Sequence, residues 1–318
     1  MLDLINKSKP MQTFENSEHE NSSSFQQWIS GQDGCKHFLR SWIAQSERAV
    51  LVYLHGIEGH SLWIGETAAF LQQQGISVHA MDRRGSGMSK ESRGDLTDYK
   101  LLMDDCETVL QSLHAKSRKA PLFLMANCWG AKVAALLCSR NHKISSMLSG
   151  LILSSPAITV KVDLPLSKKV LIALRFFTGN LTPIEIPLNP EDFTDNPHYL
   201  DFIRRDELRL MEATSRFFVN SQILTFLSSR SASQIDIPTL IVQAGTDSIV
   251  EHEGVKKWFN RLSSADKELR IFEGIYHSLD FHDAPTEYRN VLLNWLNRQI
   301  SNDANGSPRP LSGGQGQP

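Results

Sequence analysis

The stretch "LFLMANCWGAKVAALLC" (Leu122–Cys138) decides the fold. Its start, Leu122–Met125, is a short apolar run typical of a buried strand, and Trp129–Ser139 has helical spacing. Cys128 lies between them, with a small residue two positions away on each side (A-N-C-W-G). A tight strand-to-helix turn needs such small neighbours, and it holds its central residue at positive φ with the side chain above the sheet. The pattern predicts a nucleophile at Cys128; the alternative is a small cysteine packed between helix and sheet.

The rest of the chain alternates between strand and helix patterns. Lys36–Ala44 alternates weakly, as an antiparallel edge strand would. Further strands are predicted at Val50–Leu54, Ile76–Met81, Leu151–Leu153, Thr239–Val242 and Leu269–Phe272, and helices at Leu62–Gln74, Asp98–Leu113, Val255–Leu262 and Tyr288–Ile300. Short buried strands that alternate with helices predict an α/β fold, with a mostly parallel central sheet flanked by helices.

One long interruption defines the predicted domain organisation. No core strand is predicted in residues 159–230, far beyond the roughly 2–6 residues of an ordinary connection, so we expect an inserted helical lid there. It divides the α/β core into residues 31–158 and 231–301. Residues 1–30 and 302–318 are predicted to be a flexible N-terminal segment and a disordered C-terminal tail, because both ends are polar and poor in apolar residues.

The predicted lid is unusually apolar for a surface element. Helices are expected at Lys168–Phe177 and Glu207–Leu227. Leu171 and Leu174 are candidate substrate-binding residues that admit an acyl chain; the alternative is that they pack within the lid. The basic residues among them, Lys168, Lys169 and Arg175, suit a membrane surface or an acidic carrier protein, or else form a solvated helix face.

Base, acid and oxyanion loop are each found after a predicted strand. Asp247 follows Thr239–Val242, and His277 follows Leu269–Phe272. Because the carboxyl ends of parallel strands share one edge of the sheet, nucleophile, acid and histidine in this chain order predict a triad of Cys128, Asp247 and His277.

The loop after Val50–Leu54 reads His55-Gly56-Ile57-Glu58-Gly59-His60. Gly56 allows the backbone to turn, so the amides of Ile57 and Trp129 are predicted to form an oxyanion hole. His55 is expected to brace this loop by hydrogen bonding.

Composition excludes several other classes of protein. The 318 residues carry a net charge of −2, so no basic field exists to attract nucleic acid. Four cysteines are too few for a disulfide scaffold, which favours a reducing compartment. We see neither a signal peptide nor a run near the roughly 18 apolar residues of a membrane span. A cytoplasmic location is therefore expected.

Together these motifs resemble the monoacylglycerol lipase-like branch (lysophospholipase/serine aminopeptidase type) of the α/β-hydrolase superfamily. The resemblance covers about Cys35–Ile300 and rests on "HGIEGH", "DRRGSGMS" (82–89), "ANCWGA", "QAGTDSIV" (243–250) and "EGIYHSL" (273–279), with further likeness in the lid at 166–196. It implies acyl-ester chemistry under a lid, without metal or cofactor. It also implies the roles of nucleophile for Cys128, base for His277 and orienter for Asp247.

The chain departs from this branch at the turn, where cysteine replaces the usual serine. Here it resembles dienelactone hydrolases, which are shorter and lack the lid, and polyhydroxyalkanoate synthases, which transfer acyl groups from thioesters. A thiolate attacks thioesters readily and leaves an acyl-cysteine that still reacts with a nucleophile. The predicted function is hydrolysis or transfer of an apolar acyl group from an ester or thioester, with coenzyme A or an acyl carrier protein as carriers to consider. The alternatives are a plain monoacylglycerol or lysophospholipid esterase and a non-catalytic ligand-binding homologue.

Overall fold

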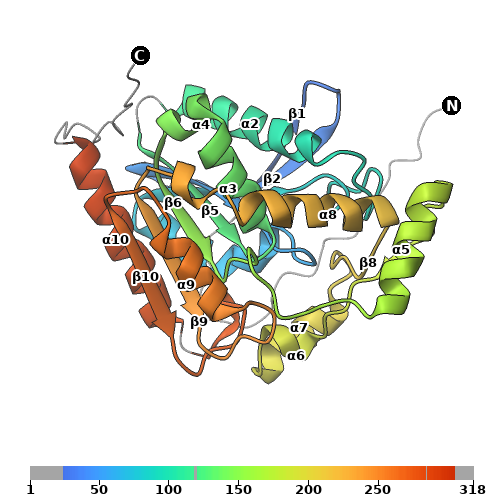
Figure 1. Cartoon of the computed structure of the whole chain (residues 1–318). Helices are drawn as coiled ribbons and strands as arrows, with labels where there is room; N and C mark the ends of the chain where they lie inside the picture. Colours follow the sequence, from blue (N-terminus) through green and yellow to red (C-terminus); the bar gives the residue numbers. More distant parts are fainter. Residues whose placement is uncertain (1–23, 118–119, 284, 305–318) are drawn as a thin grey trace, which may run out of the picture.

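An eight-stranded sheet forms the centre of the protein (Figure 1). The structure is a computed structural model, and it describes residues 24–117, 120–283 and 285–304. The strand order is β1-β2-β4-β3-β5-β6-β9-β10. All neighbours from β4 to β10 are parallel, while β1 and β2 pair antiparallel with each other and β2 with β4. The strands are β1 (Phe25–Ser30), β2 (Lys36–Trp42), β3 (Ala49–Leu54), β4 (Ile76–Asp82), β5 (Leu122–Asn127), β6 (Leu148–Ser154), β9 (Thr239–Ala244) and β10 (Lys267–Phe272).

Helices cover both faces of this sheet and bury its continuous apolar strands. One core contains side chains of α1 and α10, and the other contains those of α2, α3 and α9. The helices of the core are α1 (Gly65–Gln73), α2 (Tyr99–Lys116), α3 (Gly130–Arg140), α4 (His142–Met147), α9 (His252–Asn260) and α10 (Thr286–Ala304), with short 3₁₀ turns η1 (Ser61–Ile64), η2 (Ala232–Gln234) and η3 (Leu279–Phe281). The predicted class, a mostly parallel sheet flanked by helices, is confirmed.

Both chain ends differ from the sequence prediction. Residues 25–30, predicted to be flexible, form β1, which pairs with β2 and packs Trp28 edge-on against Phe38 at 5.3 Å. The edge strand at this end of the sheet is therefore β1, not the segment at 36–44. At the other end α10 continues to Ala304, so the first residues of the predicted tail are helical. The remaining terminal residues of both predicted segments, 1–23 and 305–318, lie outside the described residues.

The insertion between β6 and β9 contains four helices and a small two-stranded antiparallel sheet. They are α5 (Leu166–Thr178), β7 (Ile184–Glu185), α6 (Pro190–Phe193), α7 (Pro197–Arg205), β8 (Glu212–Ala213) and α8 (Ser215–Ser228). Helix α8 begins later than the predicted Glu207, because Thr214 caps it by accepting a hydrogen bond from the Phe217 N–H (3.3 Å). Figure 1 shows α5, α6 and α7 beyond one end of the sheet, while α8 runs back along α3.

None of the helices within residues 24–117, 120–283 and 285–304 is both long and apolar enough to cross a bilayer.

Candidate active site

Cys128 occupies a strained turn between β5 and α3, as the sequence predicts. Its φ is +51°, a value that few residues other than glycine adopt. Its N–H donates to the Ser154 carbonyl (2.9 Å), and its own carbonyl accepts from the Ala157 N–H (3.0 Å). A Cβ at Gly130 would lie 2.6 Å from the His55 carbonyl oxygen, so only glycine fits the start of α3. The surroundings thus fix the strained conformation, which is typical of a functional site.

The loop at 55–60 approaches the cysteine closely. A Cβ on Gly56 would lie 3.2 Å from Cys128 Cβ, so this approach depends on glycine. No hydrogen bond among the described residues uses the N–H of Ile57 or of Trp129. The two amides predicted to form the oxyanion hole are therefore both free to receive a negatively charged oxygen.

His277 and Asp247 form a buried pair beside the turn. His277 Nδ1 lies 2.8 Å from Asp247 Oδ2, and both residues are at most 4% exposed. Asp247 Oδ1 accepts from the backbone N–H groups of Ile249 and Val250, each at 2.9 Å. Burial raises the pKa of Asp247, but His277 and these two amides outweigh it, so its pKa is lowered on balance. The carboxylate is consequently ionised and oriented toward the imidazole.

The free nitrogen of this imidazole faces the charge of the cysteine. Burial alone would lower the pKa of His277, but negative charge on Cys128 and on Asp247 outweighs it and raises that pKa to about 10. The contact between the Cys128 sulfur and Nε2 contributes least and falls short of a formed hydrogen bond, and Nε2 has no other partner in the described chain. Nε2 is thus available to exchange a proton with the sulfur or with a substrate.

Two other carboxylates near His277 have partners elsewhere. Burial raises the pKa of Asp280 to about 6, and the polar groups that lower it are Thr67, Arg289 and Tyr288. Asp283 Oδ1 accepts from Asn196 Nδ2 at 2.5 Å. Asp247 is therefore the carboxylate that the structure pairs with the imidazole.

His55 braces the oxyanion loop, in the role that the sequence analysis expects. Its Nε2 accepts from the Arg83 N–H (3.2 Å), so Nδ1 carries the proton and donates to the Gly56 carbonyl at 2.7 Å. Burial lowers the pKa of His55 well below its usual value. A neutral, doubly bonded imidazole of this kind is a structural support rather than a base.

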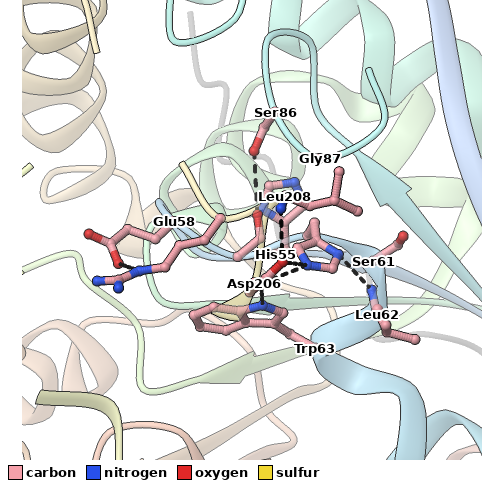
Figure 2. Close-up of polar contacts among 12 residues, drawn as sticks. His55, Glu58, Ser61, Leu62, Trp63, Ser86, Gly87, Asp206 and Leu208 are labelled. Carbon is pink, nitrogen blue, oxygen red and sulfur yellow. Dashed lines mark hydrogen bonds and ion pairs between the residues drawn. The ribbon is translucent and has the colours of Figure 1, made fainter. Parts of the chain in front are cut away.

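Contacts between this loop and the lid were not predicted from the sequence (Figure 2). His60 donates through Nε2 to Asp206 (2.9 Å), and Trp63 Nε1 donates to the same carboxylate (2.8 Å). Glu58 pairs with Arg209 at 2.7 Å, and both are buried. Burial raises the pKa of Glu58 to about 7 although Arg209 opposes it. The segment at 206–210 is thereby fixed to the loop that carries Ile57.

The two predicted acyl-binding leucines lie in different environments on α5. Leu171 is half-buried against the core, whereas Leu174 is 59% exposed. Leu174 therefore does not line an enclosed tunnel in this structure; Ile172 is the residue of α5 that is buried. Phe193 of α6, not singled out from the sequence, instead places its ring 5.9 Å from that of His277. Little in the sequence indicates Phe193, because α6 spans only four residues and shows no helical periodicity of its own.

Among the described residues, no group of three or more His, Cys, Asp or Glu side chains is arranged to hold a metal ion. The chemistry available at the turn is that of a thiol, an imidazole and a carboxylate, beside two free amides.

These features together define the class of protein: an α/β-hydrolase that acts on ester bonds. A family profile described as "Serine aminopeptidase, S33" matches residues 45–283, and the chain belongs to this family.

Individual relatives agree with this assignment. The chain is 26% identical to a monoglyceride lipase of Rattus norvegicus over 274 residues, which cover 85% of this chain and 88% of the relative. It is also 26% identical to phospholipase YtpA of Bacillus subtilis over 251 residues, covering 75% and 91%. Among solved structures, a soluble variant of the Saccharomyces cerevisiae monoglyceride lipase superimposes with a TM-score of 0.80 at 20% identity, covering 91% of this chain and 99% of that one. This last likeness concerns the fold.

Proposed function

We propose that the protein cleaves an ester or thioester of an apolar acyl group through an acyl-cysteine intermediate. The observation that carries this proposal is the position of Cys128, at positive φ on the turn, beside an imidazole that is bonded to Asp247. The free amides of Ile57 and Trp129 complete the set of groups that acyl transfer requires.

In the first half-reaction, the Cys128 thiolate attacks the carbonyl carbon and the electron pair of the C=O bond moves to oxygen. The amides of Ile57 and Trp129 donate to this oxyanion. When the intermediate collapses, the bond to the leaving group breaks, and the leaving oxygen or sulfur takes a proton from His277 Nε2. An acyl-cysteine and a neutral imidazole remain.

In the second half-reaction, a water molecule gives its proton to His277 and attacks the thioester carbon. Collapse releases the carboxylic acid and restores the thiolate and the imidazolium. An acceptor hydroxyl or thiol in place of water gives transfer instead of hydrolysis, and the cysteine supports this alternative because a thioester stays reactive toward such acceptors.

For the acyl donor we propose a lipid ester of the monoacylglycerol or lysophospholipid kind, in agreement with the names of the relatives. A thioester of coenzyme A or of an acyl carrier protein is the second candidate, and the thiol nucleophile is the feature that favours it.

Intact mass after incubation with a panel of monoacylglycerols, lysophospholipids and acyl-coenzyme A thioesters tests these proposals. We expect a mass increase equal to one acyl group, present in the wild type and absent in Cys128→Ala, together with release of free acid. Binding of the panel without adduct or turnover would instead identify a non-catalytic homologue. An adduct that persists in Cys128→Ala would place the chemistry at another residue.

We further propose that α5 contacts a lipid surface. Leu166, Val170, Leu174 and Phe177 are between 59% and 84% exposed and follow one another at intervals of three or four residues, which places them on one side of the helix. Lys168 and Lys169 belong to the same helix but pair with Glu185 and Asp163, so the apolar stripe alone carries this proposal. Such an apolar stripe exceeds what scattered surface residues would give.

We also propose a cytoplasmic location. All four cysteines are free thiols, which supports a reducing compartment. Fractionation of cells that express the full chain tests this proposal, and recovery in a secreted fraction would contradict it.

A further inference from the structure

Arg83 is a buried cation without a carboxylate partner among the described residues. It is 7% exposed and takes part in none of the ion pairs between them. Its guanidinium donates to the carbonyl oxygens of Gly56 (Nη1, 3.5 Å) and Ile57 (Nη2). It also lies 5.0 Å from the centre of the Trp129 ring and 5.5 Å from that of Phe217. Burying a cation is costly, and in the described chain these two carbonyl oxygens and two aromatic rings are what offsets the cost.

These contacts bear directly on the first amide of the oxyanion hole. The Gly56 carbonyl and the Ile57 N–H belong to one planar peptide unit and point in opposite directions. Arg83 and His55 both donate to that carbonyl, and Arg83 also holds the next one. By fixing the carbonyl on one side, they aim the Ile57 N–H to the other.

The same guanidinium also helps to hold the residue that carries the second amide. The Trp129 ring is stacked on Phe217 with centroids 5.4 Å apart, and its Nε1 donates to Ser221 of α8 at 2.8 Å. Arg83 lies over both rings, so it contacts the two parts of the chain that supply the oxyanion donors.

Charge adds to this geometry. Burial lowers the pKa of Arg83 to about 9, while Asp82 and negative charge on Cys128 oppose this decrease. Lys132, on the first turn of α3, shows the same pattern: it is 5% exposed, donates to Thr225 Oγ1 (2.8 Å), and burial lowers its pKa to about 8 while Cys128 opposes it. Both buried cations therefore favour negative charge at the reacting sulfur.

We propose that Arg83 is the positioning residue of the oxyanion hole: through the carbonyls of Gly56 and Ile57 and the Trp129 ring, it aligns both donor amides and stabilises negative charge beside Cys128. Arg83 acts through these groups and does not itself contact the acyl donor. The proposal rests on the acyl-cysteine mechanism above and names the residue that shapes its transition state.

Three substitutions separate geometry from charge. Arg83→Met removes both, Arg83→Lys keeps the charge but loses the planar fork that reaches two carbonyls, and Lys132→Met removes a nearby charge that contacts neither carbonyl. Arg93→Met is the control for kcat and ketone affinity, because Arg93 also donates to loop carbonyls, those of Gly87, Leu208 and Arg209, but to no carbonyl of the oxyanion loop at 56–57.

The measurements are kcat and KM, the inhibition constant of an apolar trifluoromethyl ketone, and the pH dependence of Cys128 alkylation. The ketone adds the thiolate to its carbonyl and places an oxyanion in the hole. For Arg83→Met we expect kcat and ketone affinity to fall together by about 10²-fold, with KM little changed, since loss of one oxyanion donor costs about this much. Its alkylation profile should also move to higher pH.

Arg83→Lys should lose kcat and ketone affinity but keep the wild-type alkylation profile, whereas Lys132→Met should move that profile with a smaller loss of kcat. Arg93→Met should resemble the wild type. Wild-type kcat and ketone affinity in Arg83→Lys and Arg83→Met would overturn the proposal, and Arg83→Lys decides if the methionine variant does not fold. If the wild type forms no acyl adduct, the proposed function fails; an unshifted alkylation profile in Arg83→Met then overturns this inference separately.

Discussion

Replacing Asp247 with asparagine tests the pairing at the centre of the site. Asparagine keeps an oxygen for the amides of Ile249 and Val250 but presents an NH₂ group where Oδ2 stood. Gln243 now donates to that oxygen at 3.1 Å, and its own Oε1 has no partner, so its amide can rotate and accept from the new NH₂. His277 cannot adapt in this way: Nδ1 has to become the acceptor, which leaves the proton on Nε2, facing Cys128.

The magnitude follows from the charges around His277. Two of the four contributions that raise its pKa to about 10 come from Asp247, and burial opposes them all. An adjacent opposite charge shifts a pKa by about one to three units, so loss of the Asp247 carboxylate should lower the pKa of His277 by about two units, or about 3 kcal/mol of imidazolium stabilisation at about 1.4 kcal/mol per unit. A thiolate needs less help than an alkoxide, so kcat/KM should fall by about 10²-fold, less than the roughly 10⁴-fold of a serine triad.

Steady-state hydrolysis of a p-nitrophenyl ester and an acyl thioester measures this loss, with thermal unfolding as the check on folding. Asp283→Asn is the matched control, because Asp283 lies in the same loop as His277 but bonds to Asn196. A kcat/KM within about two-fold of the wild type would refute the assignment of Asp247.

Three further predictions concern the nucleophile, a buried acid and the lid. Cys128→Ser should lose most thioester turnover, because an alkoxide needs a stronger base, and full activity by enzyme assay would contradict the thiolate mechanism. Burial raises the pKa of Glu58 to about 7, so its protonated form stabilises the fold below about pH 4.5 and this stability is lost as pH rises through 7. In Glu58→Gln the free energy of unfolding in urea should therefore decline by about 3 kcal/mol less over this pH range than in the wild type. The same pH dependence in both proteins would exclude this role of Glu58. The double variant Val170→Glu, Leu174→Glu should no longer sediment with anionic vesicles but should still hydrolyse a soluble ester. An equal loss of vesicle binding and of soluble-ester hydrolysis would instead assign these residues to the acyl pocket.

The sequence predicts those features that depend on local pattern and on the order of residues along the chain. Cys128 and Asp247 follow buried apolar strands and His277 follows the edge strand β10, so the three residues of the proposed triad could be singled out by their order after strands. Strand β1 was missed because backbone pairing with β2 holds it in place, while its own side chains are exposed or half-buried and give no apolar pattern.

Contacts between distant segments could not be predicted from local pattern. In "DRRGSGMS" Arg83 is one of two arginines that follow a predicted strand, and only folding places it over Trp129. The pairs Glu58–Arg209 and His60–Asp206 join residues about 150 positions apart, and neither spacing nor composition indicates them.

Helix α8 belongs to the insertion by sequence, yet its residues Phe217 and Ser221 hold the side chain of Trp129, whose backbone N–H is the second donor of the proposed oxyanion hole. The insertion is therefore not modular. Chimaeras that exchange lids between relatives should join the chains after Arg205, so that α5 to α7 are replaced while α8 and the contacts of Asp206 and Arg209 with the oxyanion loop are retained. A graft of the entire segment would replace groups that hold Trp129 together with the rest of the lid, and its kinetics would mix the two effects.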